Sequence, residues 1–230
     1  GSAADNTLEG KWSVFYNEEI FSDGVAVIFF YTSKRIVTEF SSGYKETSDV
    51  GIITRVDNRR VLASINDKNA IDVYKEWLKL KDKDIVQNDL IMKSLISPIG
   101  VRDRLGNLIA IRGLYKVNDD GSINVGSGLA EKTAVIRMES TISDLADFSV
   151  KSFKSLKKKS SNSAGYLLIH DAVIRVGLKE KMDDVYEKIK KESKGVPFLI
   201  PFMFSEYGYT EDDQVNTTGN LMNCFISFEK

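Results

Sequence analysis

The chain has 230 residues, of which 42% are hydrophobic and 28% charged, the composition of an ordinary soluble globular protein. Its 32 basic and 33 acidic residues leave a formal net charge of −1, so charge gives no reason to expect nucleic acid or an anionic membrane as a partner. No apolar run reaches membrane-spanning length, and no signal peptide is visible.

Cysteine and histidine are scarce. The single cysteine, Cys224, excludes a disulfide within the chain and fits a reducing cytoplasm. One histidine and no cysteine pair leave few ligands for a structural zinc site. Cys224 lies between Asn223 and Phe225 in an apolar run, which predicts a buried, unreactive thiol.

The first part of the chain is predicted to be mainly β-structure. Residues 12–16 and 25–31 are expected to be strands joined by a turn at 22–24. The second run is apolar throughout, which is typical of a central strand. Further strands are predicted at 35–40, 51–56 and 60–65.

Two helices are predicted next. Asn66 or Asp67 is expected to cap the first, because apolar residues then fall on one helical face. That face contains Ala70, Val73, Tyr74, Trp77 and Leu78. The second helix is predicted at 84–95 and ends before Pro98.

The middle of the chain returns to β-structure. Strands are predicted at 108–115, 122–125 and 133–138, with a turn at 118–121. Thr141 is then expected to cap a long helix that ends near Lys159. A last strand is predicted at 221–228.

A βαβ unit is predicted near the C-terminus. Tyr166–His170 and Val196–Phe204 are apolar runs, and between them Lys179–Ser193 has one apolar stripe at helical spacing. Short connections favour parallel strands, so both strands end at one edge of the sheet. Ligands of open α/β sheets usually bind at this edge.

Two segments leave that edge, and they supply the candidate site. The first runs from Asp171 to Arg175, and the second contains Ser205, Glu206, Tyr207 and Tyr209. Arg175 is the expected anchor, since its guanidinium suits a carboxylate or phosphate. Glu206 could hold a ligand amine, which makes an amino acid a natural guest. The alternative is that Arg175 only forms a structural ion pair with Asp171 or Glu206.

The same segments carry a family resemblance. Residues 171–175, the following helix, and the run from Val196 to Gly208 resemble the C-terminal half of the FIST sensory domain. Earlier motifs keep the order and spacing of the family pattern. They are Ser42-Gly43-Tyr44, Thr54, Ile65-Asn66, Ala70, Tyr74, Ile111-Arg112 and the turn at 118–121.

The resemblance implies a cytoplasmic sensory domain that binds a small ligand and reports it to a signalling partner or output domain outside this chain. The resemblance also adds Asn223, Tyr44 and Arg112 to the ligand site. The residues themselves form no catalytic constellation, so no catalytic residue is expected. The resemblance also divides the chain into 1–95, the end of an N-terminal FIST half, and 96–230, a C-terminal half. We expect these parts not to unfold independently.

Two other functions stay open. Some members of the resembled family bind haem through histidine, so His170 is a candidate axial ligand of a gas sensor. An enzyme could also use Arg175, Glu206 and a tyrosine in the same crevice. In either case the fold class expected is α+β, with mixed and antiparallel sheets flanked by helices and one C-terminal βαβ unit.

Overall fold

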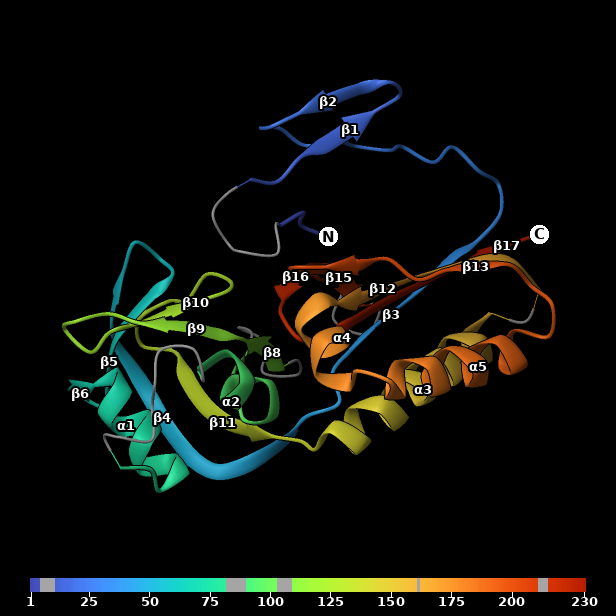
Figure 1. Cartoon of the computed structure of the whole chain (residues 1–230). Coiled ribbons are helices and arrows are strands. Elements are labelled where there is room, and N and C mark those ends of the chain that lie inside the picture. Colours follow the sequence, from blue (N-terminus) through green and yellow to red (C-terminus); the bar gives the residue numbers. More distant parts are fainter. Residues whose placement is uncertain (5–10, 82–89, 103–108, 161, 211–214) are drawn as a thin grey trace.

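The computed structural model describes residues 1–4, 11–81, 90–102, 109–160, 162–210 and 215–230. Its strands and helices form two lobes that lie side by side (Figure 1). The architecture confirms the predicted α+β class with mixed and antiparallel sheets.

The first lobe is built on an antiparallel sheet with the order β8-β7-β11-β4-β5-β10-β9, and β6 pairs with β5. Its strands are β4 (Lys45–Asp57), β5 (Val61–Ile65), β6 (Lys68–Asn69), β7 (Ile99–Arg102), β8 (Ile109–Arg112), β9 (Leu114–Val117), β10 (Ile123–Val125) and β11 (Ala134–Glu139). Helices α1 (Ala70–Leu78) and α2 (Leu90–Ile96) pack against it.

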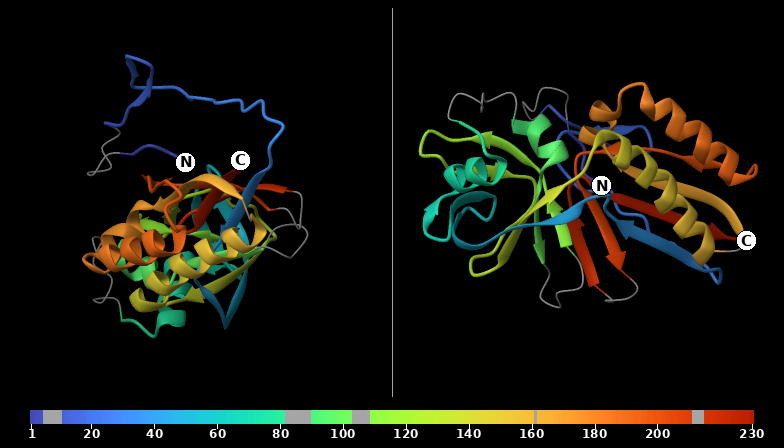
Figure 2. Two further views of the ribbon diagram at one scale, coloured as in Figure 1. Left: turned by 90° about the vertical axis from the view of Figure 1, so that its right-hand side faces the viewer. Right: turned by 90° about the horizontal axis from the view of Figure 1, so that it is seen from below.

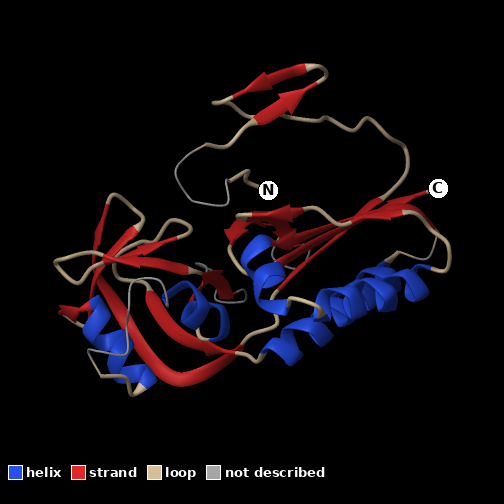
Figure 3. Ribbon diagram, viewed as in Figure 1, coloured by secondary structure: helices blue, strands red, loops and turns tan. Residues whose placement is uncertain are grey.

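The second lobe is built on a sheet with the order β13-β12-β17-β3, and β14 also pairs with β12. Its strands are β3 (Ile36–Ser41), β12 (Ser163–Asp171), β13 (Phe198–Leu199), β14 (Phe202–Met203) and β17 (Asn223–Glu229). Figure 3 shows α3 (Ile142–Lys159) and α5 (Lys181–Ser193) along one side of this sheet. The hairpin of β15 (Glu206–Thr210) and β16 (Val215–Gly219) lies on the other side (Figure 1).

The predicted βαβ unit is present. Both short strands β13 and β14 run parallel to β12, with Tyr166 opposite Phe198 and His170 opposite Phe202. The expected strand at 196–204 is interrupted at Pro201, which has no N–H to donate to a neighbouring strand. The carbonyl of Pro201 still accepts from the His170 N–H at 3.0 Å.

The crossover contains two helices. Before α5, α4 (Ala172–Leu178) begins directly after β12, where the Asp171 side chain caps it by accepting from Val173 N at 2.7 Å and Ile174 N at 3.0 Å. The predicted cap of α3 is confirmed, since Thr141 Oγ1 accepts from Asp144 N at 3.1 Å.

The cap predicted for α1 is wrong. Asn66 and Asp67 have positive φ angles of 51° and 61°, so they form the turn between β5 and β6. Asn69 precedes the helix instead, and its amide donates to Asp120 O at 2.7 Å. Residues 84–89 of the second predicted helix lie outside the described residues, and the helix is described from Leu90.

The central strand predicted at 25–31 is also wrong. The segment forms no strand, and its large apolar side chains are between 60% and 95% exposed. It connects β3 to a separate hairpin of β1 (Val14–Tyr16) and β2 (Glu19–Phe21), which Figure 2 shows away from both lobes. No described strand pairs with this segment, so its apolar side chains have no sheet in which to be buried.

In both lobes, strands that are distant in sequence pair with one another. β4 pairs with β11 in the first lobe, and β3 pairs with β17 in the second, so strands on either side of residue 95 share each sheet. Within the part of the chain that the structure describes, no helix has the length and apolar character needed to cross a membrane.

Candidate functional site

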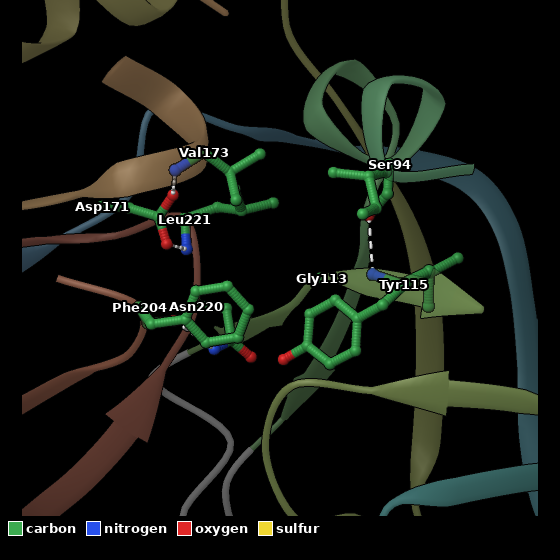
Figure 4. Close-up of a pocket in the computed structure, with 10 residues that line it drawn as sticks. Ser94, Gly113, Tyr115, Asp171, Val173, Phe204, Asn220 and Leu221 are labelled. Atoms are coloured by element: carbon green, nitrogen blue, oxygen red, sulfur yellow. Dashed lines mark hydrogen bonds between the residues drawn. The ribbon is translucent and has the colours of Figure 1, made fainter. Parts of the chain in front are cut away.

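A narrow pocket lies between the two lobes (Figure 4). The first lobe lines it with residues of α2 and β9, and the second lobe lines it with residues around the start of α4 and the start of β17. As the pocket stands, it has room for only about one water molecule. A larger ligand therefore requires the walls to move apart.

Asp171 lies at the end of β12 and is buried in this pocket. Its Oδ1 caps α4, and its Oδ2 accepts from Leu221 N at 3.0 Å. Burial raises the pKa of the carboxyl to about 6, against the opposing effect of these hydrogen bonds. Since a carboxylate offers about four acceptor positions and three are used, one remains.

Asn220 and Tyr115 face one another across the pocket (Figure 4). Asn220 is only 2% exposed, and its Nδ2 donates to Ser205 Oγ at 2.8 Å. No described residue donates to its Oδ1. A Cβ at Gly126 would collide with both Asn220 Oδ1 and the Tyr115 hydroxyl, so glycine allows these two side chains to lie close to the backbone at this position.

Two aromatic rings lie beside these polar groups on the pocket wall. The rings of Tyr115, from the first lobe, and Phe204, from the second, have centroids 5.7 Å apart and are tilted by 35°. Burial is the main cause that raises the pKa of the Tyr115 hydroxyl, and the charge of Asp171 is the next. The pocket thus combines buried acceptors with aromatic surface.

Glu206 and Tyr44 extend the buried polar region. Glu206 is fully buried, with Oε2 accepting from Met222 N at 3.3 Å and no described donor to Oε1. Burial and then Asp171 raise its pKa well above the usual range. The Tyr44 hydroxyl donates to Leu95 O at 2.8 Å, and burial followed by Asp171 and Glu206 raises its pKa.

The FIST N domain matches residues 1–68, and the FIST C domain matches residues 70–209. The chain belongs to the FIST family. FIST domains are generally sensory domains of signal-transduction proteins. Comparisons with curated proteins and with solved structures found no match.

In this FIST protein the two predicted arginines lie outside the pocket. Arg175 is on α4, where Nη1 donates to Lys179 O at 3.1 Å and the guanidinium lies 5.9 Å from the centre of the Phe202 ring. Arg112 is buried, and it donates to the carbonyls of Ile111, Thr218 and Gly128. Burial lowers the pKa of Arg112 to about 10. Both arginines therefore bind backbone carbonyls of the protein itself.

The other residues predicted to bind the ligand lie in different parts of the structure. Tyr207 and Tyr209 line a separate open groove beside β15 and β16. Ser205 is buried against Asn220, and Asn223 is buried at the start of β17. Of the nine predicted ligand residues, only Asp171 is among those that line the interlobe pocket.

His170 does not fit the role of a haem ligand. It is 0% exposed, and its ring packs 5.5 Å from the Phe225 ring and 6.2 Å from the Phe202 ring, measured between centroids. It lines none of the described pockets. Within the described ranges, no three His, Cys, Asp or Glu residues are grouped to hold a metal ion.

Sequence reasoning missed Tyr115, Phe204 and Asn220 as pocket residues, and it missed Gly126, which lies against two of them. Gly126 was part of a glycine-rich loop that lacks a nucleotide-binding pattern. Its importance comes from two side chains distant in sequence, and no local spacing reveals such a contact. Asn220 follows Gly219 before an apolar strand, which indicates only a turn.

The buried position expected for Cys224 is confirmed, and it leads to a prediction of slow labelling. The thiol contacts Tyr207 O at 3.2 Å, and burial raises its pKa to about 11. Because thiolate is the reactive form, a disulfide reagent at pH 8 should label the native chain at least ~100-fold more slowly than the unfolded chain. Absorbance after mixing measures both rates, and equal rates would contradict the buried position.

Proposed function

We propose that this FIST domain is a cytoplasmic sensory input module that binds a small molecule in the interlobe pocket. The observation that carries this proposal is the buried Asn220 Oδ1, which has no described donor and lies on the pocket wall. A buried acceptor without a partner costs about 1–3 kcal/mol, so a ligand or a water that donates to it is favoured.

Coupling to a signal follows from the position of the pocket. Tyr115 belongs to one lobe, and Phe204 and Asn220 belong to the other, so an occupant contacts both. A ligand that binds one spacing of the lobes better than another shifts the population toward it. A signalling partner or an output domain outside this chain would detect that change.

Thermal denaturation with a metabolite collection tests the proposal. A ligand at 100 times its Kd should stabilise the native chain by about 2.7 kcal/mol through mass action, and so raise Tm. Gly126→Ala should abolish the rise, because the added Cβ would push Tyr115 and Asn220 out of their positions on the pocket wall. Far-UV circular dichroism checks that the variant is folded.

Gly128→Ala is the matched control. Gly128 is exposed, and the atom nearest to an added Cβ is the Arg59 carbonyl oxygen at 4.0 Å. This variant should keep the full ligand-dependent rise. If Gly126→Ala also keeps it, the ligand binds elsewhere, and loss in Arg175→Ala alone would favour the site proposed from sequence.

A further inference from the structure

The chemistry of the interlobe pocket specifies a ligand class, and this inference rests on the proposed function. We infer that the pocket takes a primary amine with an apolar body and no carboxylate group. The inference combines an unpartnered buried acceptor, a buried carboxyl, two aromatic rings and the absence of a cation among the described lining residues.

The polar groups of the pocket are mainly acceptors. Asn220 Oδ1 has no described donor, and Asp171 retains one acceptor position after its three backbone hydrogen bonds. The Asn220 amide nitrogen already donates to Ser205 Oγ at 2.8 Å and to Phe204 O at 3.5 Å. A protonated amine has three N–H donors and no acceptor, so it complements this arrangement.

The aromatic and aliphatic walls suit the rest of such a ligand. An ammonium group is attracted to the faces of aromatic rings, here those of Tyr115 and Phe204. Ile91, Val173 and Leu221 complete the lining with apolar surface. The apolar part of the ligand can therefore be buried against these side chains, which is favourable because it removes apolar surface from water.

Among the described residues of this pocket, a ligand carboxylate would find no cation, only the hydroxyl donors of Ser94 and Tyr115. None of the described lining residues is cationic, and Asp171 would repel a second negative charge. Arg112 donates to three carbonyls, and Arg175 donates to Lys179 O on α4. Burying a carboxylate beside Asp171 without a cation to neutralise it is unfavourable.

Matched pairs of compounds test the inference on the full chain. Calorimetric titrations at pH 7.5 compare phenethylamine with phenylalanine, and 3-methylbutylamine with leucine. At least one amine should bind, at least ~10-fold more tightly than its amino acid. 2-Phenylethanol, which keeps the body and lacks the charge, should bind more weakly than phenethylamine.

Asp171→Asn tests the role of the charge while keeping a residue that caps helices well. It should weaken amine binding by roughly 10- to 100-fold, the loss expected for one charged hydrogen bond. Asp144→Asn is the matched control, because Asp144 is an exposed carboxylate in the first turn of α3. It should leave amine binding unchanged. Tyr115→Phe removes only a hydroxyl and gives a second variant if Asp171→Asn fails to fold.

The outcomes separate this inference from the proposed function. If the amino acids bind more tightly than the amines, the amine assignment is wrong, but the proposed sensory function is not contradicted. The same holds if neither class binds while another metabolite gives a rise in Tm that Gly126→Ala abolishes. The absence of any Gly126-dependent rise overturns both. Amine binding that is equal in Asp171→Asn and the unchanged chain also overturns the assignment.

Discussion

Phe225→Ala is expected to destabilise the protein by about 3–5 kcal/mol, whereas Phe29→Ala is expected to change stability by less than about 0.5 kcal/mol. Both phenylalanines lie in apolar runs that the sequence predicts to be strands. Phe225 is 0% exposed in β17, and Phe29 is 75% exposed. The first substitution leaves a cavity in the core, and the second removes few contacts.

Urea denaturation followed by circular dichroism measures both free energies of unfolding. The slope of stability against urea concentration should stay the same in all three chains, so that a change in midpoint reports stability alone. A loss of several kcal/mol in Phe29→Ala would show that residues 25–31 are buried in solution, contrary to the structure.

This comparison shows how far the sequence predicts the fold. An alternating or apolar run indicates that a segment can be a strand, but a strand also needs neighbours for its backbone. The run at 221–228 becomes β17 because β12 and β3 lie on either side of it. The run at 25–31 has an equally apolar sequence, and no described strand pairs with it.

Local chemistry was the most informative part of the sequence. The helix cap at Thr141 and the turn at 118–121 depend on residues close together in the chain, and the parallel strands of the βαβ unit are separated only by their crossover. Helix α4 was not predicted, although Asp171 precedes it as a capping residue. Its short apolar sequence lacks the polar face that marked α5.

The site was less predictable because it forms between lobes. Asp171 was chosen for its position after a strand, and the pocket includes it. Arg175, chosen for its charge in the same segment, lies one helical turn further on and contacts Lys179 O and Phe202. Helix formation, which the sequence did not reveal, placed these two side chains in different surroundings.

Two adjacent buried residues give the protein opposing responses to pH. Burial lowers the pKa of His170 from 6.5 to about 4, and it raises the pKa of Asp171 from 3.8 to about 6. Between pH 4 and 6.5 the native state binds fewer protons at His170 than the unfolded state does, so this residue makes stability rise with pH. Between pH 3.8 and 6 the native state binds more protons at Asp171, so this residue makes stability fall.

His170→Leu should therefore stabilise the protein most strongly in acid. Relative to the unchanged chain, the gain in unfolding free energy should be roughly 3 kcal/mol larger at pH 4 than at pH 8. At pH 8 a gain of about 1–3 kcal/mol should remain, because leucine replaces an imidazole whose two buried nitrogens have no described partners. Urea denaturation across this pH range measures the difference.

Asp171→Asn provides a control of opposite sign. It removes the carboxyl that must ionise in a buried place, so its stability relative to the unchanged chain should improve as pH rises from 4 to 7, by roughly 3 kcal/mol. The substitution also removes a good acceptor for Leu221 N, which lowers the stability of the variant by the same amount at every pH and so leaves the slope of the difference curve unchanged. Difference curves that stay flat with pH in both variants would show that neither group is buried as the structure places it. Difference curves with slopes of opposite sign would show that burial at the end of β12 disfavours the charged forms of both His170 and Asp171.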